Sequence, residues 1–142
     1  TAAPQNAATD RLSAGRKVVL FSVPGACPPT CHAKHLPGYL EHHDALKAKG
    51  VDAIACLAVN DVFVMDAWGK ASGAGDKVTM LADGNADFTR ALGLELDASG
   101  FGMGTRGKRF AMIVNDGVVL HLNVEAAGEF RVSAADYVLG QL

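Results

Sequence analysis

Residues 17–39, KVVLFSVPGACPPTCHAKHLPGY, decide the fold because they place a cysteine between a strand and a helix. The run 18–21, VVLF, is β-branched and aromatic, and it predicts a buried strand. Pro24 and Gly25 end that strand. From Cys31 onward, apolar residues recur every three or four positions, which predicts a helix. The cysteine therefore stands in the first turn of a helix, shortly after a strand has ended.

This position gives Cys31 a chemical interpretation. The first turn of a helix presents unpaired backbone N–H groups and the positive end of the helix dipole, and both favour a thiolate over a thiol. A thiolate at neutral pH is a nucleophile and can be oxidised. The alternative is a small buried hydrophobic residue, the common fate of a free cysteine. The rigid proline-rich turn ahead of Cys31 favours the reactive interpretation.

Composition limits the class of protein. The chain has 142 residues, 49% of them hydrophobic, which suits one domain with a substantial core. The net charge is −2 and the charges are interspersed, so we expect neither a nucleic-acid partner nor a membrane-surface partner. No apolar run approaches the ~20 residues of a membrane span. Three cysteines do not make a secreted disulfide framework, so we expect a reducing compartment and no secretion.

The rest of the chain alternates strands and helices. Residues 1–16 are Ala-rich and polar and are predicted to be a flexible lead-in to a domain spanning 17–142. An Asn-Asp-Gly turn at 115–117 predicts a β-hairpin, and glycine-rich 94–107 predicts an irregular loop. Strands are predicted at 51–59, 78–82, 109–114 and 118–124. Helices are predicted at 31–49, at 86–92 and at 134–142, the last after a Ser133 cap. A further helix is predicted after a cap at Asn60 and Asp61, with Phe63, Val64, Ala67 and Trp68 on its inner face.

The resulting order is β-α-β-α-β-α-β-β-α. Parallel strands joined by helices come first, and an antiparallel hairpin with a closing helix follows. This order predicts an α/β protein with a thioredoxin-like fold, in which a mixed central sheet has helices on both faces. Because one fold can host many functions, the function must be argued from particular residues.

Arg109 is the first candidate partner of Cys31. An arginine at the head of a strand that follows a glycine-rich loop can point across the sheet end toward a helix N-terminus. There it would stabilise a thiolate and donate hydrogen bonds to an oxygen substrate. A surface arginine is the alternative, and Arg106 and Lys108 compete for the same role.

Cys56 is the second candidate partner. It lies in a predicted apolar strand, so it is either an inert core thiol or a cysteine that resolves oxidised Cys31. A disulfide requires Cα atoms within roughly 7 Å. Either the strand passes close to the first helix turn, or local unfolding brings the two cysteines together.

A third constellation suggests a metal. Cys27, Cys31, His32 and His35 have C-x3-C and C-x3-H spacings, and residues 31 and 35 are one helical turn apart. The spacing is only moderately specific, because zinc sites more often have two-residue gaps and need four ligands. The remaining histidines are expected to be solvated (His42 and His43) or structural (His121).

The chain also resembles a known family over residues 17–142. The type II, or peroxiredoxin-5-like, peroxiredoxins carry PGAFTPTCSxxHLPG, GVD(V/I)IAC(I/L)SVND and FVMxAW. The matching stretches here are PGACPPTCHAKHLPG, GVDAIACLAVND and FVMDAW. The likeness continues through LADGNADFTRALGLELD, the KRFAMIV strand and LNVE.

This resemblance implies a peroxidase that reduces hydrogen peroxide and alkyl hydroperoxides without metal or organic cofactor. Cys31 matches the cysteine that attacks the peroxide and becomes a sulfenic acid. Arg109 matches the arginine that stabilises its thiolate and holds the peroxide, and Pro24 the proline that shields it. Cys56 matches the resolving cysteine, whose disulfide thioredoxin or glutaredoxin reduces. The resemblance also implies a homodimer, and a plastid or cytoplasmic location.

Two departures from the family motif bear on this site. Pro28 stands where the family has a threonine whose hydroxyl bonds the thiolate and the peroxide, and proline has neither hydroxyl nor N–H. Thr30 is a candidate substitute. Cys27 stands where the family usually has phenylalanine, and it keeps an alternative open: CPPTC resembles the C-x3-C site of copper-delivery proteins with this fold. Replacing Cys27 with phenylalanine should spare a peroxidase and destroy a copper site.

Overall fold

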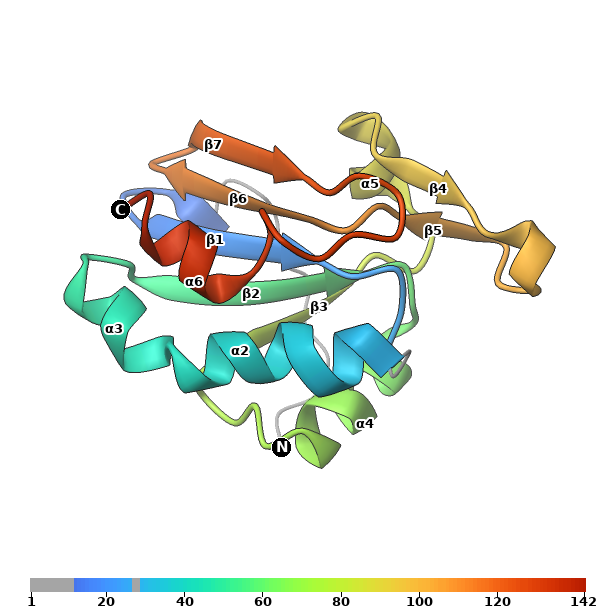
Figure 1. The fold of residues 1–142 in the computed structure, drawn as a ribbon, viewed down its shortest axis with the longest axis horizontal. Helices are drawn as coiled ribbons and strands as arrows, with labels where there is room; N and C mark the ends of the chain where they lie inside the picture. The colour runs from blue at the N-terminus through green and yellow to red at the C-terminus, as the bar shows by residue number, and fades with distance from the viewer. Residues whose placement is uncertain (1–11, 27–28) are drawn as a thin grey trace.

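The structure, a computed structural model, describes residues 12–26 and 29–142. A five-stranded sheet with the order β3-β2-β1-β6-β7 forms its centre (Figure 1). The first three strands run parallel and the last two are antiparallel to their neighbours, which confirms the predicted mixed sheet. The strands are β1 (Lys17–Ser22), β2 (Ala53–Ala58), β3 (Thr79–Ala82), β6 (Phe110–Asn115) and β7 (Val118–Val124).

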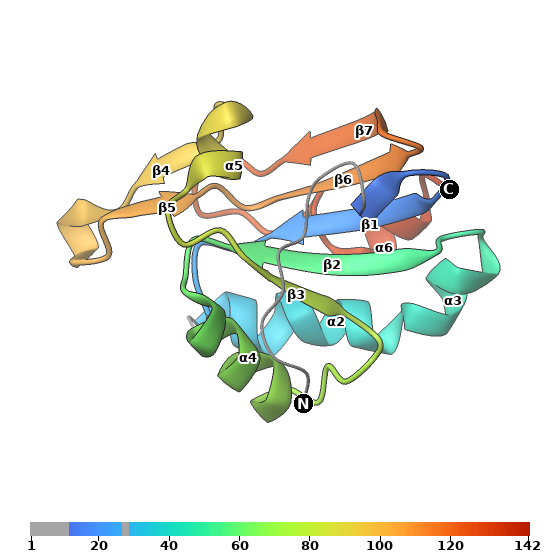
Figure 2. The same cartoon turned by 180° about the vertical axis from the view of Figure 1, so that it is seen from behind.

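Helices cover both faces of this sheet, as predicted (Figures 1 and 2). A larger apolar cluster joins one face to α2, α3, α4 and α6, and a smaller one joins the other face to α5. The π-helical turn η1 leads directly into α2. The helices are η1 (Cys31–His35), α2 (Leu36–Glu41), α3 (His43–Ala48), α4 (Val62–Ala71), α5 (Asp87–Ala91) and α6 (Ala135–Leu139).

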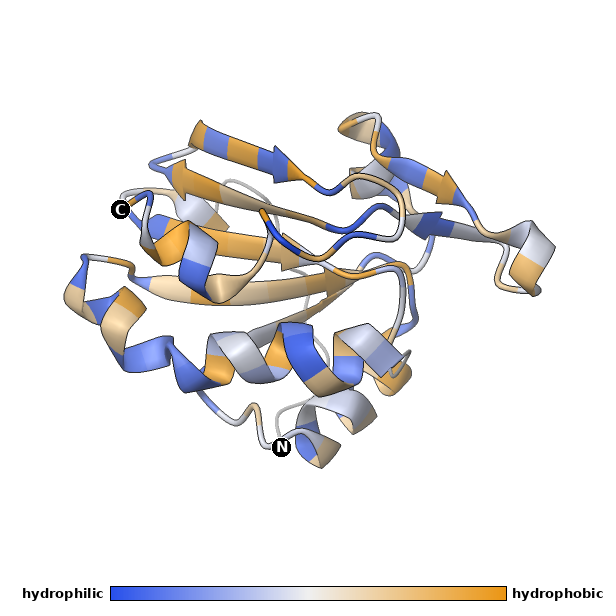
Figure 3. Cartoon of the chain, in the orientation of Figure 1, coloured by the Kyte–Doolittle hydropathy of each residue, from blue (hydrophilic) through white to orange (hydrophobic). Residues whose placement is uncertain are grey.

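Alternation along β1 explains how one strand serves both clusters. Val19 and Phe21 belong to the larger cluster and Leu20 to the smaller one, because successive side chains of a strand point to opposite faces. All three are buried. The central strands β1, β2 and β6 are correspondingly apolar along most of their length (Figure 3).

The helix predicted at 31–49 is not continuous. Residues 29–30 are already helical, the π-helical turn η1 follows, where the Leu36 N–H donates to the Cys31 carbonyl, and the helix is interrupted between α2 and α3. His42 stands at that break with φ −92° and ψ 9°, and its ring nitrogen Nδ1 hydrogen-bonds the Gly38 carbonyl. The Gly38 carbonyl accepts from both the His42 ring and the His42 backbone N–H, so the chain stays hydrogen-bonded through this break.

The prediction of an irregular loop at 94–107 is wrong. This segment forms a ribbon of β4 (Glu95–Asp97) and β5 (Thr105–Gly107), with the 3-10 turn η2 (Ser99–Phe101) at its tip. The ribbon projects from the main sheet (Figure 1). Gly102 and Gly104 have φ of 71° and 66°, so the glycines allow the chain to reverse and pair with itself.

Two details of the helices also differ from the prediction. In α4 the buried face consists of Met65, Trp68 and Gly69, so only Trp68 of the four predicted residues faces inward. Phe63 is 75% exposed. The Asp61 side chain caps α4 by accepting from the Val64 N–H at 2.8 Å, as predicted.

Ser133 does not cap the last helix, contrary to the prediction. Helix α6 begins after Ala134, which occupies the cap position without a side-chain hydrogen bond. The Ser133 hydroxyl donates instead to Glu125 at 2.6 Å. The hydroxyl serves here as a donor that closes the loop on Glu125, and the helix begins one residue later than a Ser133 cap would place it.

The hairpin turn has the predicted backbone. Asp116 and Gly117 have φ of 47° and 79°, as a tight turn between β6 and β7 requires. The Gly15 N–H donates to Asp116 Oδ1 at 2.7 Å, so residues 12–16 contact this turn. No helix within residues 12–26 and 29–142 is long and apolar enough to cross a membrane.

Candidate active site

The register between β1 and β6 brings Cys31 and Arg109 to one end of the sheet. Ser22, the last residue of β1, pairs with Phe110, the first residue of β6. The chain that follows β1 and the residue that precedes β6 therefore lie at the same sheet edge. After β1 the chain bends at Pro24 and enters η1 at Cys31.

Arg109 contacts two residues of η1 at once. Its Nη2 donates to Cys31 Sγ at 3.0 Å, and its Nη1 donates to His35 Nδ1 at 2.7 Å. Cys31 and His35 are fully buried. Hydrogen bonds from a guanidinium to an anion are among the strongest in proteins, so this group is suited to hold a sulfur or oxygen anion formed here.

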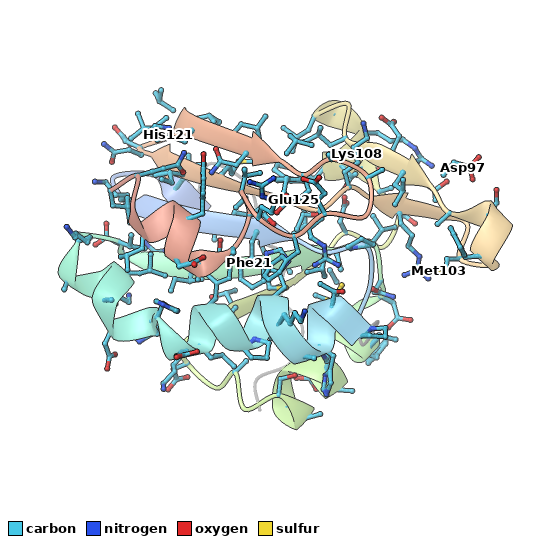
Figure 4. All side chains as sticks on the ribbon, viewed as in Figure 1. Phe21, Asp97, Met103, Lys108, His121 and Glu125 are labelled. Atoms are coloured by element: carbon cyan, nitrogen blue, oxygen red, sulfur yellow. The ribbon has the colours of Figure 1, made fainter. Side chains whose placement is uncertain are left out.

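The other two basic residues of this segment do not reach the cysteine. Arg106 donates to the carbonyls of Val59 at 3.1 Å and Met103 at 2.9 Å, so its guanidinium ties β5 to the end of β2. Lys108 is exposed, and Figure 4 shows it near the β4–β5 ribbon. Of the three candidates, Arg109 is the residue that the fold places against Cys31.

His35 orients Arg109 and is neutral. Its Nε2 lies 3.0 Å from the Ser133 carbonyl and therefore carries the proton, which leaves Nδ1 to accept from Arg109. Burial, with the adjacent Arg109 charge, lowers the pKa of His35 to about 3, against the opposing effects of the Ser133 carbonyl and Glu125. The ring therefore accepts from Arg109 throughout the physiological pH range.

The loop 125–133 supports this arrangement from behind. The Ser133 carbonyl accepts from His35 and also from the Tyr39 hydroxyl at 2.7 Å. Glu125 Oε2 holds the loop closed by accepting from Ser133 Oγ, the Ser133 N–H and the Arg131 N–H. Burial opposes the charge on Glu125, yet these hydrogen bonds keep its pKa below the ordinary value.

Aromatic rings fill the space around His35 and Arg109. Phe21 of β1 stacks on Tyr39 with centroids 4.0 Å apart, and it lies 4.8 Å from the His35 ring. Phe130 meets His35 edge-on at 4.9 Å, and the Arg109 guanidinium carbon lies 5.8 Å from the Phe130 centroid. Figure 4 shows Phe21 between the sheet and α2, with Glu125 on the loop beyond it. The guanidinium thus lies within cation–π range of the Phe130 ring.

Cys56 lies on the same side of the sheet as Cys31. It stands in β2 opposite Phe21 of β1, is fully buried, and belongs with Cys31 to the larger apolar cluster. Both thiols are free. Burial raises the pKa of Cys56 well above its ordinary value, a charge on Cys31 would raise it further, and Arg109 opposes this. Cys56 is therefore a neutral thiol in this conformation.

Several predicted site residues cannot be placed against the cysteine. Pro24 lies partly buried in the bend after β1. Thr30 occupies the cap position of η1 without a side-chain cap, and no hydrogen bond among the described residues joins it to Cys31. Cys27 and Pro28 lie outside the described residues.

The metal alternative finds little support from the histidines. His32 accepts a hydrogen bond from Trp68, and His35 is used by Arg109 and Ser133. Within residues 12–26 and 29–142, no three His, Cys, Asp or Glu side chains are grouped to hold a metal ion. The copper alternative requires Cys27 together with Cys31, and Cys27 lies outside the described residues. His121, predicted to be structural, lies on β7 with its side chain exposed (Figure 4).

Sequence reasoning missed most of the network behind Arg109. It assigned His35 to a metal and Ser133 to a helix cap, and it gave Glu125 and Phe130 no role. His35 and Ser133 are 98 residues apart, and no local pattern links them. Two signals were available: the one-turn spacing of Cys31 and His35, and the histidine of the family motif, which stands at position 35.

Comparisons with known proteins agree with this arrangement. The Redoxin family model matches residues 1–139. Peroxiredoxin-2B of Arabidopsis thaliana is 51% identical over 138 residues, which cover 97% of this chain and 85% of that protein. The chloroplastic peroxiredoxin-2E-2 of Oryza sativa subsp. japonica is 54% identical over 134 residues, which cover 92% of this chain and 60% of that protein.

Solved structures show the same relationship. Reduced Prx3 of Vibrio vulnificus in complex with hydrogen peroxide has a TM-score of 0.90 and 58% identity, covering 94% of this chain and 86% of that one. A thioredoxin-like sheet with a buried cysteine and an arginine at its edge defines a class of thiol-based redox enzymes. The chain belongs to the redoxin family and, within it, to the type II, peroxiredoxin-5-like peroxiredoxins. It is a thiol-dependent peroxidase, as the resemblance implied.

Proposed function

We propose that the protein reduces hydrogen peroxide and alkyl hydroperoxides at Cys31. The observation that carries this proposal is the 3.0 Å hydrogen bond from Arg109 Nη2 to Cys31 Sγ. The Cys31 thiolate attacks one peroxide oxygen, so an S–O bond forms as the O–O bond breaks. The other oxygen leaves as water or an alcohol after taking up a proton. Cys31 is oxidised to a sulfenic acid and the peroxide is reduced.

Arg109 supports this step by donating to the sulfur and to the oxygen on which charge develops. Its orientation is fixed by the neutral His35 ring, so little reorganisation is needed as the charge moves. The family resemblance assigns Pro24, in the bend before η1, the role of shielding the thiolate from bulk water. These roles match those that the family resemblance implies for the same positions.

Cys56 is the proposed resolving residue. Its thiol attacks the sulfur of the Cys31 sulfenic acid, an S–S bond forms, and water leaves. A dithiol reductant such as thioredoxin, or glutaredoxin with glutathione, then returns both residues to thiols. The burial of Cys31 and Cys56 in one apolar cluster supports this pairing.

Mass spectrometry after a brief pulse of hydrogen peroxide tests both steps. With a sulfenic-acid trap present, we expect a trapped Cys31 sulfenate or a Cys31–Cys56 disulfide. Cys31→Ser should abolish turnover. Cys56→Ser should abolish the intramolecular disulfide, and thioredoxin-driven turnover should be lost with it. An unoxidised Cys31 under stoichiometric peroxide would refute the peroxidase assignment for this site and point to Pro28, which replaces the family threonine.

We also propose a homodimer and a plastid or cytoplasmic location. Chloroplastic relatives at 54% and 49% identity support the plastid. Light scattering at micromolar concentration should give twice the chain mass. Microscopy of the natural protein carrying a C-terminal fluorescent tag should place it in one of these two compartments. A secreted product would contradict the proposal.

A further inference from the structure

The side of η1 that faces α4 is held by a hydrogen bond between two side chains. Trp68 Nε1 donates to His32 Nδ1 at 3.1 Å. Trp68 is buried in α4 with 2% exposed, whereas His32 is exposed and directly follows Cys31. Because an indole N–H can only donate, His32 accepts at Nδ1. Of the two partners, the exposed one, His32, therefore belongs to the turn that carries the proposed reactive cysteine.

The turn lies inside a longer helical segment, because residues 29–30 are helical before it and α2 continues it. The turn itself is π-helical over five residues, and Thr30 before it makes no side-chain cap. π-helical turns are rare and short, and they often occur at functional sites. On its inner side, Cys31 and His35 bond to Arg109. On its outer side, among the described residues, the bond to Trp68 is the one that ties the turn to α4.

Formation of the Cys31–Cys56 disulfide takes the Cys31 sulfur away from its hydrogen-bond donor Arg109. Both thiols are buried and form no disulfide, and Cys31 Sγ accepts from Arg109 at 3.0 Å. The bond needs the two sulfurs about 2.05 Å apart. Burial also raises the pKa of Cys56, so its thiol gains reactivity when η1 moves and exposes it. Opening of η1 therefore precedes or accompanies disulfide closure.

We propose that the His32–Trp68 hydrogen bond is a latch that keeps η1 closed and sets the rate at which oxidised Cys31 reaches Cys56. This inference rests on the proposed role of Cys56 as resolving residue. Neither His32 nor Trp68 has a hydrogen bond to the Cys31 sulfur among the described residues, so both are proposed as positioning residues. The type II motif PGAFTPTCSxxHLPG has serine at this position, which offers no ring nitrogen to Trp68. The family motif quoted above therefore does not supply this hydrogen bond.

The latch predicts an effect on one chemical step and none on the other. Losing one hydrogen bond should make opening about five-fold more favourable. Disulfide closure should speed up by the same factor, while peroxide attack on Cys31 stays within about two-fold of its rate in the natural protein. At high peroxide, less Cys31 should reach the sulfinic acid, because the sulfenic acid is consumed sooner.

Rapid-quench mass spectrometry with separate rates for sulfenic acid and disulfide provides the test. His32→Ala and Trp68→Phe each remove one partner, and the double variant should be no faster than either single one. His32→Asn places an acceptor oxygen near the position of Nδ1 and should restore the slow rate. Lys34→Ala, an exposed change in the same turn, is the matched control and should close at the natural rate.

The outcomes separate the latch from the function on which it rests. Disulfide closure at the natural rate in both His32→Ala and Trp68→Phe overturns the latch. Additive acceleration in the double variant also overturns it, because the two residues would then act separately. If the natural protein forms a Cys31 sulfenic acid but never a Cys31–Cys56 disulfide, the assignment of Cys56 fails instead. If no sulfenic acid forms, the peroxidase proposal for Cys31 fails.

Discussion

Lowering the pH from 7 to 5 should destabilise the fold through His35. The folded protein keeps this ring neutral, because burial and the Arg109 charge lower its pKa to about 3. In the unfolded chain the ring has an ordinary pKa of about 6.5 and takes up a proton as the pH falls. The unfolded state therefore binds more protons than the folded state between about pH 6.5 and pH 3. The stability contributed by neutral His35 is present at pH 7 and is lost progressively toward pH 3.

The size of this effect follows from the two pKa values. Over the window the free energy of unfolding falls by up to about 1.4 kcal/mol per pH unit. Between pH 7 and pH 5, pKa values of 6.5 and about 3 give a loss of about 2 kcal/mol. Asp44, Asp97 and Glu125 have lowered pKa values, so their contributions are present above about pH 4.5 and are lost only below it. The window from pH 5 to pH 7 therefore isolates His35 from these carboxylates.

Urea unfolding at pH 5, 6 and 7 measures this loss. The matched variant is His35→Gln, which cannot titrate and keeps an amide N–H to donate toward the Ser133 carbonyl. We expect this variant to be less stable than the natural protein at pH 7, yet to lose about 2 kcal/mol less between pH 7 and pH 5. Equal losses in the two proteins would refute the argument that His35 is buried and neutral.

Three further predictions concern single residues. Arg109→Ala should slow sulfenic-acid formation at Cys31 by about 100-fold or more. Arg109→Lys should recover only part of this rate, because one ammonium cannot reproduce the two hydrogen bonds of the planar guanidinium. Stopped-flow peroxide kinetics in which Arg109→Ala reacts as fast as the natural protein would contradict this role. Glu125→Gln should loosen the loop 125–133 and reduce hydrogen-exchange protection of the Ser133 amide about five-fold; unchanged protection would remove Glu125 from the loop's support. Gly117→Ala should lower the free energy of unfolding by about 1 kcal/mol because φ is 79°, whereas Gly100→Ala, with open space around its Cα, should have little effect.

The strands and the position of the cysteine follow from the sequence because they depend on local patterns. The β-branched run of β1, the Asp-Gly turn after β6 and the cap at Asp61 each specify a backbone conformation within a few residues. Together with the element order, they predicted the mixed sheet and placed Cys31 at its edge. The specific motifs around Cys31 and Cys56 identified the family, which the comparisons confirmed.

Other features depend on contacts that no short stretch contains. Residue spacing alone left Arg106 and Lys108 as competitors of Arg109, which only the family resemblance singled out. The physical reason is the register between β1 and β6, which places the head of β6 beside the end of β1. The pairing of β4 with β5 in the 94–107 ribbon, and the face that α4 buries, depend on how the rest of the fold packs against these segments. For those reasons the sequence predicted a loop and the wrong inward residues.

The sequence by itself determined the class of chemistry, and the tertiary structure decided how the site is held. A cysteine after a strand, an arginine at the head of another strand and a second cysteine in an apolar run could be read from residue types and spacing. The neutral His35, the Glu125–Ser133 closure and the His32–Trp68 bond could not. His35 and Ser133 are 98 residues apart and His32 and Trp68 are 36 apart, while Glu125 and Ser133 close a loop of the chain. These partners are fixed only when the fold brings them together and leaves few other groups for their polar atoms to bond.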